Sequence, residues 1–183
     1  PGYYKEQGSG YITEKTFMDL NCTEVFPGDL VISRLNEPLG RACIIPDLNA
    51  RIVTSVDNVI LRPTSPNERR YLMHLFNAPE FAAYTSILAR GATMQRLSRG
   101  LLGNIQIPLP PAEEQRQIAA YLDHTTALID QLIEKNTALL ELLDQQRKAI
   151  INEALTKGLD PKAPMKESGI GWLGTIPSTW RLS

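Results

Sequence analysis

Two polar segments of the sequence carry side chains that could form hydrogen bonds to DNA bases and phosphates. One follows an expected strand, and the other precedes the last expected strand of the globular part. Arginine can pair with guanine, asparagine and glutamine with adenine, and serine and threonine with phosphate oxygens or base edges. The candidate DNA-binding residues are Ser33, Arg34, Asn36, Arg41, Arg90, Thr93, Gln95, Arg96 and Arg99. These types suit a DNA reader, although each of them could instead be an ordinary solvated surface residue.

The charge distribution is uneven along the chain. The 183 residues have a formal net charge of −1, 43% are hydrophobic and 21% are charged, as in an ordinary globular protein. Between Arg51 and Arg99, however, seven arginines and no lysine stand against three acids. Guanidinium groups favour bidentate contacts with phosphate or guanine. An ion-paired, solvated surface is the alternative interpretation of the same arginines.

Patterns of catalysis, metal binding and cofactor binding are not recognisable in the sequence. His74 and His124 lack a second ligand at helical spacing, and Cys22 and Cys43 lack metal-ligand spacing. The glycine pattern GxGxxG at 169–174 follows a proline-rich linker rather than a strand, so we do not interpret it as a dinucleotide site. We therefore expect no catalytic residue, no metal site and no cofactor. The chain is expected to recognise a ligand without catalysing a reaction.

The elements that must position the polar segments are short strands followed by two helices. A turn at 27–29 introduces the first strand, and a proline opens each helix. The expected order is a helix at 13–20 capped by Thr13, a strand at 30–33, β-rich runs at 40–46 and 50–63, helices at 66–77 and 79–90, a polar loop at 91–103 and a short strand at 104–109. The predicted fold class is α+β, a mixed β-rich globular domain followed by one long helix of coiled-coil type.

The long helix is predicted from Ala112 to Lys157. Pro110 and Pro111 stand where a helix needs no backbone donor, and Gly158 can adopt the left-handed cap that ends it. At 1.5 Å per residue such a helix is roughly 70 Å long, which exceeds the diameter of a small domain. We therefore expect it to need a partner helix.

An apolar seam at coiled-coil spacing runs along this predicted helix. The seam residues are Leu122, Ile129, Leu132, Asn136, Leu139, Leu143 and Ile150. Asn136 either fixes the register or the partner number, or is a tolerated polar residue in the seam.

The junction before the long helix carries a family resemblance. The sequence PLPP at 108–111, Glu114-Gln115 and Ile118 resemble the conserved region of the specificity subunits of Type I restriction-modification enzymes. The upstream segments GDLVIS (28–33) and GAT (91–93), and the tail GIGW (169–172) with IP (176–177) and Trp180, resemble recurring points of the same family.

This resemblance implies an organisation and a set of partners. Residues 1–110 would be a DNA target-recognition domain lacking its N-terminal start, 111–158 the spacer helix, and 159–183 a linker and the start of a second recognition domain. In such subunits each of two recognition domains reads one half of a bipartite site in double-stranded DNA, and two spacer helices pair antiparallel. The second spacer helix would lie in cis or come from another copy. The chain would then be either a fragment or a half-subunit.

The resemblance assigns catalysis to other subunits. Modification subunits methylate adenine with S-adenosylmethionine, and a motor and nuclease subunit translocates and cuts DNA in the restriction system. A cytoplasmic location is expected, because the sequence has no membrane-length apolar run. The rival hypothesis is a coiled-coil interaction scaffold without DNA binding, which explains the seam but gives the arginine-rich segment no role.

Overall fold

The computed structural model describes residues 10–35, 39–91 and 95–182. The chain divides into two compact units, Pro1–Thr125 and Thr126–Ser183, which are treated separately below. Among the described residues, no helix is long and apolar enough to cross a membrane.

A three-stranded antiparallel sheet forms the centre of the first unit. Strand β2 (Leu30–Ser33) lies between β3 (Ala42–Ile44) and β5 (Asn58–Leu61), with Val31 opposite both Cys43 and Ile60. Side chains alternate along β2, so Leu30 and Ile32 are buried in the core. A separate pair joins β1 (Glu24–Val25) to β4 (Ile52–Val53). The strands predicted around residues 30–33, 40–46 and 50–63 are thus present.

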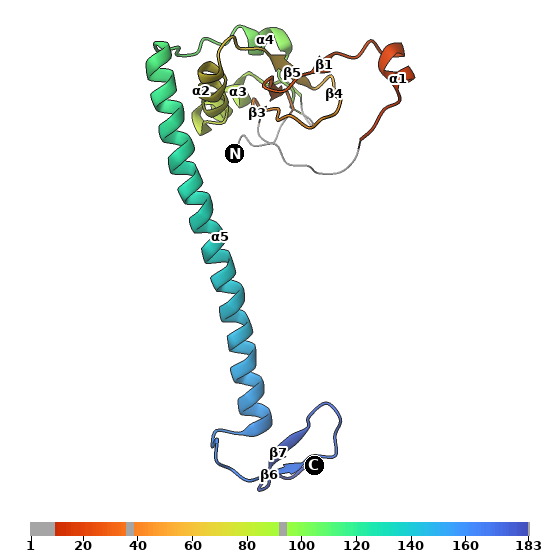
Figure 1. The fold of residues 1–183 in the computed structure, drawn as a ribbon, viewed down its shortest axis with the longest axis vertical. Coiled ribbons are helices and arrows are strands. Elements are labelled where there is room, and N and C mark those ends of the chain that lie inside the picture. The colour runs from red at the N-terminus through yellow and green to blue at the C-terminus, as the bar shows by residue number, and fades with distance from the viewer. Residues whose placement is uncertain (1–9, 36–38, 92–94, 183) are drawn as a thin grey trace. The chain divides into compact units, whose positions relative to one another are not determined.

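The predicted helices are present, one before the strands and two after them (Figure 1). The short helix α1 (Glu14–Asp19) begins where Thr13 accepts a hydrogen bond from the Thr16 N–H, at 3.1 Å. Helices α2 (Pro66–Phe76) and α3 (Pro79–Leu88) both start at a proline. The face of α2 that carries Tyr71, Leu72 and Phe76 closes the core over the sheet.

Gly40 allows α3 to approach the connection between β2 and β3. Its φ is +77°, and a Cβ at this position would lie 2.7 Å from the ring of Phe81. The Thr85 hydroxyl donates to the Leu39 carbonyl at 3.2 Å in the same contact. A side chain at residue 40 would therefore be both strained and too close to α3.

Two expectations about residues 91–109 were wrong. The predicted loop ends in a short helix, α4 (Arg99–Gly103), because the Ser98 hydroxyl caps it by accepting from the Leu101 N–H at 3.1 Å. The predicted strand at 104–109 is an extended segment that pairs with no strand among the described residues. Ile105 and Ile107 still pack on the core, which explains the alternating pattern that indicated a strand.

Helix α5 (Ala112–Lys157) has 46 residues and the predicted bounds. From Thr126 onward the helix belongs to the second unit, where Gly158 follows it with a φ of +78°. An antiparallel hairpin of β6 (Met165–Glu167) and β7 (Thr175–Pro177) completes this unit, with Ile176 buried. The glycines of the GxGxxG pattern lie in the connection between these two strands, not between a strand and a helix. The mixed α+β class with a long terminal helix is therefore confirmed.

Candidate nucleic-acid interface

The two polar segments predicted to bind DNA meet in the first unit. Arg96 forms isolated antiparallel bridges with both Leu35 and Arg90. The Leu97 N–H donates to the Arg34 carbonyl at 2.9 Å, and the Arg96 N–H donates to the Arg90 carbonyl at 2.9 Å. Backbone pairing thus brings Arg34, Arg90 and Arg96 together, and these three residues are called the arginine cluster below.

Arg34 is committed to contacts inside the domain. Its Nε donates to the Leu97 carbonyl at 2.9 Å, and its Nη1 donates to the Val56 carbonyl at 3.0 Å. The side chain therefore links the end of β2 to two loops that are distant in sequence. These two hydrogen bonds stabilise the arrangement of the arginine cluster.

Arg96 contacts the carboxylate of Asp57 in the turn between β4 and β5. Its Nη2 lies 2.6 Å from Asp57 Oδ1, and the Arg96 side chain remains 49% exposed. A guanidinium has five N–H donors, so an ion pair with one carboxylate leaves others available to a ligand.

The other predicted residues lie around this cluster. The Ser33 hydroxyl donates to the Leu35 carbonyl at 3.2 Å, and the Ser33 N–H donates to the Arg41 carbonyl at 2.9 Å. Arg41 and Arg90 are exposed, and Gln95 is half-buried. The predicted residues Asn36 and Thr93 lie outside the described residues.

Several arginines between Arg51 and Arg99 form ion pairs. This agrees with the alternative interpretation, in which these arginines belong to an ion-paired, solvated surface. Arg62 lies 3.1 Å from Asp29, and Arg51 lies 3.4 Å from Glu14. These partners, like Asp57, are acids that are far from the arginines in sequence. The local count of arginines therefore overstates the positive charge available to DNA.

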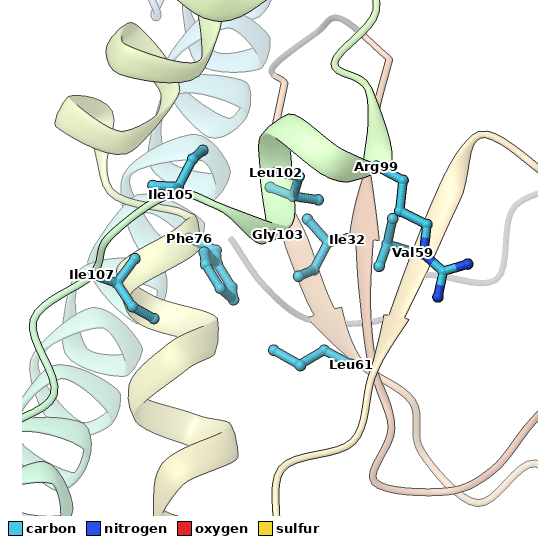
Figure 2. A pocket seen from close by; sticks show the side chains of 9 residues that line it. All are labelled: Ile32, Val59, Leu61, Phe76, Arg99, Leu102, Gly103, Ile105 and Ile107. Carbon is cyan, nitrogen blue, oxygen red and sulfur yellow. The ribbon is translucent and has the colours of Figure 1, made fainter.

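Arg99 sits at the edge of an apolar cavity of about 250 Å³ (Figure 2). Side chains of β2, β5, α2 and α4 line the cavity, among them Ile32, Leu61 and Phe76. In Figure 2 the Arg99 side chain runs along Val59 and its guanidinium points away from the apolar side chains. The methylene stem thus packs on the domain while the charge stays outside.

Alanine at Gly103 is expected to stabilise the first unit. Gly103 ends α4 and lines the cavity, and a Cβ there would meet no atom within 4 Å. Alanine reduces the conformational freedom of the unfolded chain, so the free energy of unfolding should rise by about 0.5–1 kcal/mol. Urea unfolding of the two proteins measures this difference, and an unchanged or lower value for Gly103→Ala would contradict it.

The start of α5 is anchored on α2 by a group of polar side chains that the sequence did not predict. Asp123 of α5 contacts the guanidinium of Arg70, and its Oδ1 lies 2.7 Å from His74 Nε2. The Tyr71 hydroxyl donates to the Pro108 carbonyl at 3.0 Å. Ala119 of α5 is buried, which completes the contact. The sequence gave Asp123 no distinguishing signal, since its partners are 49 residues or more away along the chain.

The surroundings of His74 favour the neutral form of its imidazole. Burial lowers its pKa, and the positive charge of Arg70 lowers this pKa further. Because an ionised carboxylate only accepts hydrogen bonds, the neutral ring donates its Nε2 proton to Asp123. His74 is thus a packing residue of the junction, as expected of an isolated histidine.

Acidification is expected to weaken the junction through His74. The unfolded state binds a proton at His74 near pH 6.5, before the folded state does, so the free energy of unfolding falls as pH drops below about 6.5. Urea unfolding at pH 7.5 and 5.5 measures the effect, and His74→Gln should show a smaller loss between these values. An equal loss in both proteins would contradict the assignment.

The seam of α5 is exposed along most of its length. Leu132 is 60% exposed and Leu139 51% exposed, and Ile129, Leu143 and Ile150 are similarly open. Leu122, at the start of the seam, is half-buried in the first unit. The Asn136 amide donates to the Leu132 carbonyl of its own helix at 2.8 Å.

Comparison with known proteins gives the family. Residues 2–142 match the family described as the Type I restriction modification DNA specificity domain. The chain belongs to this family. The family resemblance predicted from the sequence is therefore confirmed, and specificity subunits are a non-catalytic family.

Curated specificity subunits are similar to this family member over much of its length. The putative type I restriction enzyme MjaX specificity subunit of Methanocaldococcus jannaschii is 27% identical over 94% of the chain and 40% of the relative. The MjaVIII specificity subunit of the same organism is 33% identical over 51% of the chain and 20% of the relative. The StySPI specificity subunit of Salmonella potsdam is 27% identical over 63% of the chain and 25% of the relative. The chain thus spans about two fifths of the length of the first of these relatives.

Proposed function

We propose that this chain reads one half of a bipartite site in double-stranded DNA as part of a Type I restriction-modification complex. The observation that carries the proposal is the arginine cluster, in which two polar segments of the chain join through the bridges of Arg96 to Leu35 and Arg90. Membership of a family of DNA specificity domains supports DNA recognition, and the arginine cluster supports it independently.

The long helix serves in this proposal as a spacer that pairs with a second spacer helix, in cis or from another copy. An apolar seam that is about half exposed in α5 supports pairing, because such a surface is stabilised by burial against another helix. Eight acids and five bases on this helix favour contact with protein over contact with DNA. Two copies related by a two-fold axis would read a palindromic bipartite site.

The same proposal assigns the three sequence regions. Residues 1–110 act as the recognition domain, 111–158 as the spacer helix, and 159–183 as a linker and the start of a second recognition domain. This assignment is supported by the contacts of Asp123 and Ala119, because these residues of α5 belong to the same compact unit as the residues before the helix.

Catalysis belongs to the partners. We propose that the chain docks modification subunits that methylate adenine with S-adenosylmethionine, and a motor and nuclease subunit where one is present. The chain itself then contributes sequence recognition and positioning, without a cofactor or a metal of its own.

Arg96→Ala is expected to weaken and relax DNA recognition. A bidentate contact between arginine and a base edge is worth about 1–3 kcal/mol, so the preferred site should lose roughly fivefold to a hundredfold or more in affinity. The measurement is selection of bound duplexes from a random pool by the full chain in complex with a modification subunit. Arg181→Ala, which removes an exposed arginine of the second unit, is the matched control. Identical selected sites for wild type and Arg96→Ala would remove the assignment of Arg96.

A coiled-coil scaffold without DNA binding remains the second candidate function. The ion pairs of Arg51, Arg62 and Arg96 favour it, because paired arginines contribute less to a DNA-binding field. Salt titration of DNA binding separates the two, since phosphate contacts release counterions and make the affinity fall steeply with salt. A complex that assembles without salt-dependent DNA binding would favour the scaffold.

A further inference from the structure

The turn between β4 and β5 presents a carboxylate to Arg96 from a fixed backbone. The Asp57 carbonyl accepts the Arg34 N–H at 2.8 Å, and the Asp57 N–H donates to the Ser55 hydroxyl at 3.3 Å. The Asn58 amide donates to the Thr54 hydroxyl at 2.7 Å. These bonds lie on both sides of Asp57, so its side chain leaves a turn whose backbone is hydrogen-bonded.

One oxygen of the Asp57 carboxylate is buried against Arg96, while the side chain as a whole is 24% exposed. Its Oδ1 atom is buried, and no hydrogen bond reaches this atom from the described residues. The charge contact with Arg96 Nη2, at 2.6 Å, therefore compensates its burial. Since a buried carboxylate oxygen without a partner is unfavourable, the contact restrains the rotamer of Arg96.

This restraint changes what Arg96 can bind. Half of its side chain is exposed, so the N–H groups that do not face Asp57 can reach a ligand. A neighbouring carboxylate repels phosphate, but it does not repel the neutral acceptors O6 and N7 of guanine. An ordered guanidinium also loses less conformational entropy when it forms a bidentate contact.

We propose that Asp57 is a specificity-determining positioning residue, which holds Arg96 so that it reads a guanine in the half-site. The inference rests on the proposed function. It adds that the base recognised is guanine and that Asp57 orients the arginine that contacts it. Arg34 has a different part, because its contacts with the Leu97 and Val56 carbonyls brace the cluster.

The test is selection of bound duplexes by the full chain in complex with a modification subunit, using wild type, Arg96→Ala and Asp57→Asn. Asparagine keeps the shape of the side chain and the backbone bonds of the turn but removes the charge. Wild type should select a guanine at one position, and Arg96→Ala should lose that guanine. Asp57→Asn should reduce the preference for the same guanine by about fivefold or more, leave the other positions unchanged, and bind non-specific DNA more tightly.

A structural control separates orientation from folding. Ser55→Ala removes the hydroxyl that receives the Asp57 N–H and leaves the carboxylate in place, so it should lower the melting temperature without altering base preference. If Ser55→Ala changes the preference as much as Asp57→Asn, the effect comes from the turn and the proposal is overturned.

The remaining outcomes are also decisive. Loss of the guanine in Arg96→Ala but not in Asp57→Asn would overturn the role of Asp57 and leave the proposed function standing. Equal loss at every position in Asp57→Asn would reduce Asp57 to a residue needed for folding. A wild-type complex that selects no sequence would instead refute the proposed function itself.

Discussion

Lysine at both Leu132 and Leu139 is expected to abolish pairing of the spacer helix. These side chains lie on the exposed seam of α5, and burial of a leucine stabilises a helix pair by about 1.5–3 kcal/mol. Two losses on each helix, together with the cost of bringing four ammonium groups together, should weaken pairing by at least about a thousandfold. Sedimentation of the full chain measures the change, and duplex selection should then yield single half-sites in place of bipartite ones.

A control outside the seam makes this result specific. Leu155 is 70% exposed on the same helix but does not fall on the heptad positions of the seam, so Leu155→Lys should pair as wild type does. Unchanged pairing of the double lysine variant would show that α5 does not associate through this seam. Equal loss in both variants would show that the loss of pairing is not specific to the seam and would contradict the prediction.

Four residues inserted after Asn136 are expected to lengthen the gap between the two half-sites. The insertion extends a helix by roughly 6 Å, close to two base-pair steps of about 3.4 Å. When the partner helix comes from another copy, both helices carry the insertion, so the selected site should keep its half-site sequences and gain about two base pairs of spacer. In the proposed complex, methylation of the original site should fall to background, because the two half-sites would no longer match the spacing of the two proposed recognition domains.

The phase of the insertion provides a further comparison. Four residues shift the seam within the heptad, whereas seven residues preserve it and add roughly 10 Å, or about three base pairs. The same four residues placed after Gly171, in the connection between β6 and β7, leave α5 unchanged and should leave the spacer unchanged. An active variant with the insertion after Asn136 and an unaltered spacer would refute the proposed role of the helix.

Much of the fold was predictable because its signals are local. Thr13 caps α1, prolines open α2 and α3, and Gly158 follows α5 in the left-handed conformation, all as the sequence indicates. Capping and backbone preferences act within a few residues, so they can be recognised without knowledge of the fold. The prediction of a loop over 91–103 missed α4, although its signal is also local. Ser98 is the residue that caps this helix.

The candidate site was predictable in residue type but not in arrangement. The sequence indicated that Arg34 and Arg96 belong to a recognition surface, but not that Arg34 would bond to the Leu97 carbonyl or that Arg96 would face Asp57. The strand expected at 104–109 was wrong for a similar reason, because a strand needs a partner strand and Ile105 packs on the core without pairing to any strand that the structure describes.

The sequence by itself therefore determined the α+β class, the bounds of the long helix, and the family to which the chain belongs. The tertiary structure alone decided which charges meet: Asp57 with Arg96, and Asp123 with Arg70 and His74. The physical reason is that an ion pair acts over a few ångströms in space, and the path of the chain brings together residues such as Arg34 and Leu97, 63 positions apart.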